Sequence, residues 1–373
     1  MTLKTRWEEL KVSMRPRVKE WAFMLKRMRQ SPLALVGLII ICAFIVIAIL
    51  APVLAPTPAN SRDPFMMPKD EILARVRPAE PLPPTTNHIF GTIEYQYDLY
   101  YGCIWGTITA FRVGLLVVGV SLIIGLMVGT LAGYYGGMLD EVLMRFTDII
   151  IAFPGLILAM AFVIAFPQAI TLNFSIVFLV VFVLMSFGFI AFSPNKRLLL
   201  VVQVLLGASL ISVFFYPAIL AVNLSKLDKV MIAITIVGWP GYTRVIRGEV
   251  LRVKNEDYVE ASRASGSSDV GVIMRHIWPN TIYPLLIVAT LDIGAIVLTA
   301  AALSFIGIGA PEGFADWGQI IQSTRMWLIT PQLMVQYYYT FLIPGLFISL
   351  FVMGWNLLGD ALRDVLDPTL RRR

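Results

Sequence analysis

The chain has 373 residues, of which 58% are hydrophobic and only 14% are charged. A soluble domain usually carries about 25% charged residues, so this composition excludes an ordinary soluble protein and indicates a polytopic membrane protein. The net charge of +6 could suggest nucleic-acid binding, but the basic residues flank apolar segments, as in membrane topology. No nucleic-acid partner is therefore expected. The sequence has no P-loop, HExxH or GxSxG motif, so no ATPase or hydrolase activity is expected of this chain itself.

Residues 1–30 are basic and amphipathic, which predicts a cytoplasmic tail held against anionic lipid. A first membrane-spanning helix is expected at residues 31–55. Ser31 can cap its N-terminus and Pro32 suits its first turn. The apolar run is long enough to cross roughly 30 Å of hydrocarbon.

Residues 56–104 are rich in proline and predict an extracytoplasmic loop with little regular structure. His88 stands alone in this loop, without neighbouring metal ligands, so we expect a surface residue and no metal site. The transmembrane permease domain is expected to follow over residues 105–362, and its first helix, the second span of the chain, should cover about Trp105 to Leu131.

A glycine-rich sequence, AGYYGG, then predicts a tight cytoplasmic turn before a third span at Ile149–Phe166. Asp148 would lie about one turn into the membrane, where a carboxylate needs a partner. Arg145, three residues earlier, is the local candidate for an interfacial ion pair. The residues expected to shape the turn and the following segment are Gly133, Gly136, Gly137 and Pro154.

Two further apolar runs, Phe174–Phe192 and Leu198–Leu220, are joined by the short basic segment Ser193–Arg197. This pattern predicts a hairpin of two helices within residues 167–222 that turns in the cytoplasm. The next span is expected from Val230 to about Val245.

That span contains the sequence Gly-Trp-Pro-Gly at residues 238–241. Proline and glycine disrupt helical hydrogen bonding, so the span is expected to unwind or kink there. The residues concerned are Pro240 and Gly241.

Residues 255–278, called the knob from here on, form the longest polar interval in the second half of the chain. Asn255 is expected to cap a first short helix, which Gly266 should end. The residues that can cap a second short helix are Ser267, Ser268 and Asp269. Two helices joined at a glycine predict a compact shape that docks into another protein; an ordinary solvated hairpin is the alternative.

A seventh span is expected from about Pro279 to Ile308. It contains Asp292, and a carboxylate at that depth is a candidate for the substrate pathway or for a structural interaction. The last span is expected at about Gln336–Leu357, followed by a basic cytoplasmic tail at residues 363–373.

The knob carries the sequence Glu260-Ala261-Ser262, then Gly266 four residues on, then Arg-His-Ile-Trp-Pro-Asn ending in Pro279 and Asn280. This pattern resembles the EAA motif of ABC-importer permeases. The surrounding sequence is similar to that of the C-type inner-membrane subunit of dipeptide and oligopeptide importers. In that family the motif forms a cytoplasmic coupling helix that rests in a cleft of the ATP-hydrolysing subunit. The coupling residues that the resemblance implies are Tyr258, Glu260, Ala261, Arg263, Gly266, Ser267 and Asp269, with Pro279 shaping the turn after them.

The resemblance implies an all-α membrane protein of the type I ABC-importer kind. A six-helix core with an inserted hairpin at residues 167–222 would give about eight spans. The chain would form half of a translocation pathway for di- or oligopeptides in the cell membrane of a bacterium or archaeon. The implied partners are a second permease subunit, two ATP-binding cassette subunits and an extracytoplasmic solute-binding protein. ATP and Mg²⁺ would bind to those partners, and no cofactor or metal is expected on this chain.

Both termini are expected in the cytoplasm, because this orientation places most of the 30 lysines and arginines inside. Three alternatives remain open. Members of the same family that import oligosaccharides or nickel would have the same architecture. An ion-coupled secondary carrier could use Asp292 and Asp148 as protonation sites. A membrane scaffold without transport activity would co-purify with no ATPase.

Overall fold

The computed structural model describes most of the chain. The described residues are 31–59, 61, 63–76, 80–167, 169–173 and 219–366. The chain divides into two compact units, one made of Met1–Val163 with Val230–Arg373 and the other of Ile164–Lys229. Each unit is considered by itself below. The predicted tail at 1–30 and the two apolar runs of the predicted hairpin, apart from residues 219–220, lie outside the described residues.

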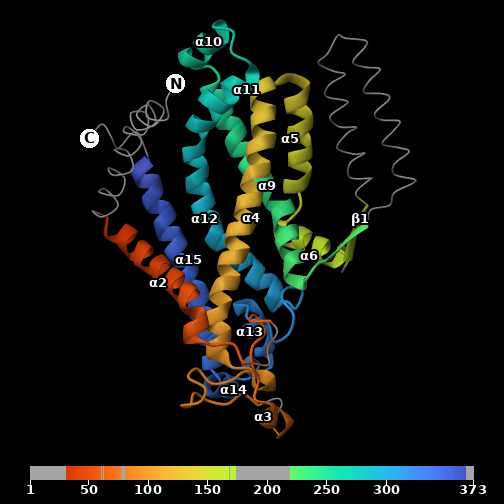
Figure 1. Cartoon of the computed structure of the whole chain (residues 1–373), viewed down its shortest axis with the longest axis vertical. Helices are drawn as coiled ribbons and strands as arrows, with labels where there is room; N and C mark the ends of the chain where they lie inside the picture. Colours follow the sequence, from red (N-terminus) through yellow and green to blue (C-terminus); the bar gives the residue numbers. More distant parts are fainter. Residues whose placement is uncertain are drawn as a thin grey trace, which may run out of the picture. The chain divides into compact units, whose positions relative to one another are not determined.

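Long helices dominate the chain (Figure 1). They are α2 (Pro32–Leu54), α4 (Leu99–Tyr135), α5 (Gly137–Ile151), α9 (Lys226–Val253), α12 (Trp278–Phe305) and α15 (Tyr339–Leu366). Among the described residues, four helices are long and apolar enough to cross a membrane, or five if α5 and the bent α6 (Gly155–Ala165) count as one span. The prediction of a polytopic helical membrane protein is confirmed, whereas the count of about eight spans is not.

Helix α2 begins after Ser31, whose side-chain oxygen accepts a hydrogen bond from the backbone N–H of Ala34 at 3.4 Å. The helix packs along α15. Glycine lets the two backbones approach closely, because a Cβ on Gly37 would lie only 2.7 Å from Leu357 Cβ. Close approach through small residues is how helices associate in lipid, where no hydrophobic force drives them together.

Helix α12 packs against both α4 and α15. A Cβ on Gly114 of α4 would lie 2.8 Å from Ile293 Cγ2 of α12. At the next residue of α12, a Cβ on Gly294 would lie 3.3 Å from the backbone of Val352 in α15. The glycines of these helices therefore serve as contact points between spans.

The predicted third span at Ile149–Phe166 is wrong as a single helix. Helix α5 ends at Ile151, α6 begins at Gly155, and the two are bent by 89°. Pro154 lies at the break, where it supplies no backbone N–H and disfavours helical geometry in the residue before it.

The unwinding expected at residues 238–241 does not occur. Helix α9 runs without interruption from Lys226 to Val253 and includes Pro240. Its packing against α4 is tight, since a Cβ on Gly125 would lie 2.5 Å from Tyr242 Cβ. A Cβ on Gly241 would meet nothing within 4 Å, so this glycine is not a contact point. Tertiary packing thus holds the helix through the proline.

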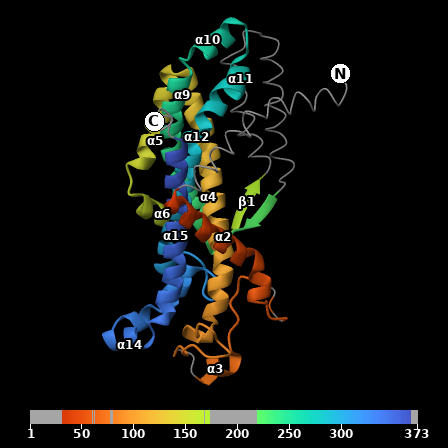
Figure 2. The same cartoon turned by 90° about the vertical axis from the view of Figure 1, so that its left-hand side faces the viewer.

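The segment between α2 and α4 is more regular than predicted. It contains a short helix, α3 (Glu71–Val76), and a 3₁₀ turn, Glu94–Gln96. Helix α4 begins at Leu99 rather than near Trp105. In both views α3 and α14 (Pro331–Gln336) lie at one end of the helices and α10 (Asp257–Ala264) at the other (Figures 1 and 2).

Asp98 fixes the start of α4 by accepting a hydrogen bond from the backbone N–H of Tyr101 at 2.8 Å. Its second oxygen lies 2.7 Å from Nδ1 of His88. His88 is half-buried and has a carboxylate partner, so it is not the isolated surface residue that was expected.

Two short helical segments, α13 (Trp317–Ser323) and a 3₁₀ turn at Arg325–Leu328, separate α12 from α14. The predicted last span, Gln336–Leu357, is displaced, because α15 runs from Tyr339 to Leu366.

The second unit begins with a feature that was not predicted. Strand β1 (Ala169–Asn173) pairs antiparallel with β2 (Ile219–Asn223), with Ala169 opposite Asn223. This short ladder is an exception to the all-α prediction and occupies the two ends of the predicted hairpin. After β2, Lys229 Nζ donates to the backbone oxygen of Phe166 at 2.9 Å.

Candidate coupling site

The knob contains a helix, a glycine turn and a second helical start. Helix α10 ends at Ala264, and Gly266 follows with φ +81°. This left-handed conformation is costly for residues with a Cβ and is readily adopted by glycine. The turn is closed by a hydrogen bond from the backbone N–H of Ser267 to the carbonyl of Ser262 at 3.2 Å.

The N-terminus of α10 differs from the prediction. Its N-cap is Glu256, which makes no capping hydrogen bond through its side chain. Asn255 instead donates from Nδ2 to the carbonyl of Leu251 at 3.1 Å, because the turn of α9 before it offers a nearer acceptor. Asp257 and Glu260 still place negative charge in the first turn of α10, where the helix dipole favours it.

The second helix of the knob is not a separate element. Helix α11 (Asp269–Val272) is capped by Ser268, whose Oγ accepts from the backbone N–H of Gly271 at 3.2 Å. A π-helical turn, Ile273–Ile277, then joins it to α12. The helical stretch is continuous from Asp269 to Phe305. A force on this half of the knob would therefore act directly on a span.

One face of the knob is buried and the other is exposed. Val259, Val272 and Ile277 are fully buried and anchor it to the helices beneath. The predicted coupling residues are all exposed; they are Tyr258, Glu260, Ala261, Arg263, Gly266, Ser267 and Asp269. The partial burial of the Tyr258 ring, and secondarily the charge of Glu256, raise the pKa of Tyr258, so its phenol is neutral at physiological pH.

Glu260 is available for an external contact. Its side chain forms no hydrogen bond or ion pair with any residue in the part of the chain that the structure describes. An exposed, unpaired carboxylate beside the N-terminus of a helix can accept hydrogen bonds from a docked protein.

Tyr134, in the last turn of α4, clamps the two halves of the knob. Its hydroxyl donates to Asp269 Oδ1 at 2.7 Å, and the guanidinium carbon of Arg263 lies 4.8 Å from the centre of its ring. Tyr134 is itself buried. One side chain therefore holds α10 by a cation–π contact and α11 by a charge-assisted hydrogen bond.

Substitution of Tyr134 should loosen the knob without unfolding the helices. Tyr134→Phe removes the hydrogen bond and keeps the ring, whereas Tyr134→Ala removes both contacts. We expect hydrogen exchange of the backbone amides at 257–272 to accelerate roughly 10–150-fold in Tyr134→Phe and further in Tyr134→Ala, since a hydrogen bond to a charged group contributes about 1.5–3 kcal/mol. Tyr135→Phe, at the exposed neighbouring position, is the matched control. Equal exchange rates in all variants would contradict the clamp.

Ion pairs connect α9 to the turn beneath the knob. Arg247 makes a two-pronged contact with Asp140 of α5, with Nη2 at 2.6 Å from Oδ2. Bidentate geometry of this kind is among the stronger side-chain interactions, and the hydrogen bond from Arg247 lowers the pKa of Asp140. Lys254 Nζ also donates to the backbone oxygen of Gly133 at 2.7 Å. The end of α4, the start of α5 and the end of α9 are thus joined.

Asp148 pairs with a different arginine from the one predicted. Its Oδ1 lies 2.6 Å from Nη2 of Arg244 in α9. Arg145 instead faces Glu141 at 3.7 Å, one helical turn earlier. The prediction from chain proximity is wrong because α5 packs beside α9, which brings a second arginine to the carboxylate.

The predicted turn glycines have different roles. Gly136 and Gly137 form the turn, with φ values of +69° and +58°. Gly133 lies inside α4, where a Cβ would meet Val250 Cβ at 3.0 Å, so it provides close packing rather than a turn. Pro279 forms no separate turn: it lies at the start of α12, directly after the π-helical segment Ile273–Ile277 and within the continuous helical stretch.

Asp292 lies midway along α12 and is half-buried. An apolar pocket of about 370 Å³ lies between α6, α9 and α12, and Asp292 is not one of the residues that line it. Those residues are Gly155, Leu156, Ala159, Ile234, Val237, Gly238, Leu298, Thr299 and Ala302. Among the described residues, no group of three or more His, Cys, Asp or Glu side chains could hold a metal ion.

A family model described as "Binding-protein-dependent transport system inner membrane component" matches residues 125–372, which include the entire knob. The chain belongs to this family. A second model, "N-terminal TM domain of oligopeptide transport permease C", matches residues 20–72. The suspected resemblance to the C-type peptide permeases is therefore confirmed.

Curated relatives cover nearly the whole chain. The dipeptide transport system permease protein DppC of Alkalihalophilus pseudofirmus is 30% identical over 95% of this chain and 91% of its own. The oligopeptide transport system permease protein OppC of Bacillus subtilis is 28% identical over 94% of this chain and 90% of its own length. A crystal structure of an amino acid ABC transporter with histidines aligns with 67% of this chain. The alignment covers 92% of that structure's chain, with 18% sequence identity and a TM-score of 0.35.

Several residues that build the site were not identified from the sequence. Sequence analysis gave no role to Tyr134, Asp140, Arg244 or Arg247. A partial signal exists, because Arg244 and Arg247 lie three residues apart and so share one face of α9. Their acidic partners lie about 100 residues away and follow only from how the helices pack.

Proposed function

We propose that this chain is one of two permease subunits of an ATP-driven peptide importer. It would form half of the translocation pathway for di- or oligopeptides. The family match over residues 125–372 carries this proposal, and the names of the curated relatives, which are dipeptide, oligopeptide and glutathione permeases, support peptides as the substrate class.

The knob is the part of this chain that fits a mechanical connection to a motor. It combines an exposed, acidic surface with a continuous helix into α12. Closure of two nucleotide-binding subunits would push on α10, and the clamp at Tyr134 would transmit the push to α4 and α12. The spans would then move as semi-rigid bodies and expose a central cavity alternately to each side.

The remaining parts of the proposal concern partners and orientation. Two ATP-binding cassette subunits would hold ATP and Mg²⁺, a second permease would complete the pathway, and an extracytoplasmic protein would deliver the peptide. The knob and both termini would lie in the cytoplasm of a bacterial or archaeal cell, and α3 and α14 would lie outside. This chain would bind no cofactor or metal of its own. Asp292 would contribute to the pathway or to its packing.

A secondary carrier that uses Asp148 and Asp292 has weaker support. The carboxylate of Asp148 already has a partner, because it pairs with Arg244 at 2.6 Å. Nothing in such a carrier would require the exposed knob.

The proposal is tested by reconstitution of the affinity-purified complex in lipid vesicles that contain ATP. We expect uptake of a radiolabelled tripeptide that needs ATP and the binding protein, with a 5–50-fold reduction in Glu260→Ala. Asp257→Ala, which removes an exposed charge from the same turn, should reduce uptake less than threefold. Peptide uptake driven by a proton gradient without ATP, or purification of the chain without any ATPase, would refute the proposal.

A further inference from the structure

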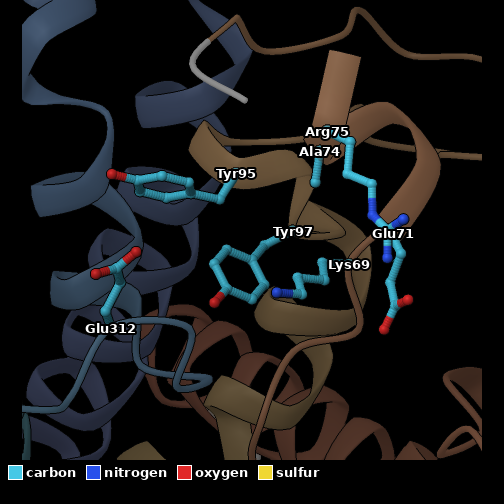
Figure 3. Close-up of a pocket in the computed structure, with 7 residues that line it drawn as sticks. All are labelled: Lys69, Glu71, Ala74, Arg75, Tyr95, Tyr97 and Glu312. Carbon is cyan, nitrogen blue, oxygen red and sulfur yellow. The ribbon is translucent and has the colours of Figure 1, made fainter. Parts of the chain in front are cut away.

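A pocket of about 410 Å³ opens at the end of the helices opposite the knob (Figure 3). Its walls come from three segments that are distant in the sequence. Lys69 lies just before α3 and Arg75 in its last turn, Tyr95 and Tyr97 lie in and directly after the 3₁₀ turn, and Glu312 lies in the loop after α12. A concave site of this volume is within the range that holds small ligands.

Backbone hydrogen bonds join the three segments into one scaffold. Lys69 and Tyr97 form an isolated antiparallel bridge. The backbone N–H of Met67 donates to the carbonyl of Gly313 at 2.8 Å. Gly313 has φ +76°, and a Cβ there would lie 2.8 Å from the Tyr97 hydroxyl oxygen. The Tyr97 ring therefore packs directly on the turn that presents Glu312.

The turn that presents Tyr95 is strained. Tyr95 and Gln96 have φ values of 59° and 61°, and a left-handed conformation costs a non-glycine residue about 1–2 kcal/mol. The fully buried Gln96 holds this geometry, because its Nε2 donates to the carbonyl of Glu80 at 2.6 Å and its Oε1 accepts from Thr92 Oγ1 at 2.8 Å. Strain kept in place by buried hydrogen bonds is common where a ligand is clamped. Here it keeps Tyr95 exposed at the wall of the pocket.

The pocket separates charges of opposite sign. Glu312 lies on one side of the tyrosine rings, and Lys69 and Arg75 lie toward the other, with Glu71 beside Arg75 (Figure 3). Within the described residues, Glu312, Lys69 and Arg75 form no ion pair. Burial, and secondarily the charge of Glu312, raise the pKa of Glu94.

We propose that this pocket binds short peptides through their two charged ends, an inference that rests on the proposed function. Glu312 would accept hydrogen bonds from the terminal ammonium group, and Lys69 with Arg75 would bind the terminal carboxylate. Tyr95 and Tyr97 would flank the peptide backbone. The site would hold an arriving peptide at the outer mouth of the pathway before it enters the spans.

The test measures binding of trialanine to the full chain in lipid nanodiscs by isothermal titration calorimetry, without the binding protein or ATP. We expect Glu312→Gln and Lys69→Gln each to weaken binding at least fivefold. N-acetyl-trialanine should bind to the wild type at least fivefold more weakly than trialanine does. Its affinity should not change in Glu312→Gln. Trialanine amide should in turn be insensitive to Lys69→Gln. Arg325→Gln removes an exposed charge at the same end, outside the pocket, and should bind as the wild type does.

Three results would overturn this inference: no binding to the wild type, equal binding of free and blocked peptides, or full binding in both pocket variants. The inference would also be overturned if Glu312→Gln and Lys69→Gln weakened only the docking of the binding protein. The pocket would then hold a side chain of that protein and not a free peptide. Uptake by the complete complex is measured in parallel. If the complex takes up peptide but the pocket does not bind trialanine, only this inference is wrong. If ATP-dependent peptide uptake is absent, the proposed function is wrong.

Discussion

Replacement of Gly266 by valine should nearly abolish ATP-driven peptide uptake while the complex still assembles. A β-branched residue at φ +81° is a genuine conformational outlier. The strain of roughly 1–2 kcal/mol corresponds to a shift of about 5–30-fold in population and would move α10 away from its docked position. Open space surrounds the glycine, with nothing within 4 Å of a Cβ. The effect would therefore come from backbone conformation and not from a clash.

The matched control for this position is Gly266→Asn. Asparagine adopts the left-handed region more easily than other residues with a Cβ, so uptake should stay within about threefold of the wild type. Initial uptake rates in vesicles and the ATPase rate of the same preparations are measured together. If valine and asparagine reduce uptake equally, bulk at the docking surface and not backbone geometry is responsible. Normal uptake in Gly266→Val would remove this turn from the coupling mechanism.

Loss of the Asp140–Arg247 ion pair should have the next largest effect. Asp140→Asn leaves a partly buried guanidinium with weaker partners, and hydrogen bonds to charged groups contribute about 1.5–3 kcal/mol each. We expect the thermal unfolding temperature of the solubilised complex to fall by several degrees. We also expect a loss of coupling, measured as an increase in the number of ATP molecules hydrolysed per peptide transported.

A double-mutant cycle separates this pair from nonspecific damage. Arg247→Gln alone should resemble Asp140→Asn, and the double variant should be less destabilised than the sum of the two. Arg145→Gln is the control, because its contact with Glu141 at 3.7 Å is exposed and long. Strictly additive losses in the cycle would show that the two side chains do not act as a pair.

The sequence was sufficient for those features that depend on local chemistry. The apolar run after Ser31 predicted α2, and the small, polar interval after Arg252 predicted a turn at Gly266 and a cap at Ser268, as the structure has them. Each of these depends on residues within one or two helical turns. The resemblance then supplied the family, because its motif lies in this local stretch.

Features that depend on packing could not be predicted. Pro240 suggested a broken helix, but contacts with Gly125 and its neighbours in α4 keep α9 continuous. Asp148 suggested a pair with Arg145, and only the juxtaposition of α5 and α9 places Arg244 closer. The strained turn at Tyr95 is a third case, since the buried contacts of Gln96 and not its local propensity determine it.

The most direct test of this account is site-specific photo-crosslinking from position 261, on the exposed face of α10, in native membranes. A photoreactive amino acid at position 261 should crosslink to an ATP-binding subunit, with a yield that changes when ATP is added. The same amino acid at position 325, at the opposite end, should not reach that subunit. Reaction of position 261 with a membrane-impermeant probe added outside the cell, or crosslinking to no ATPase under any nucleotide condition, would contradict the central claim that the knob is the contact with the motor.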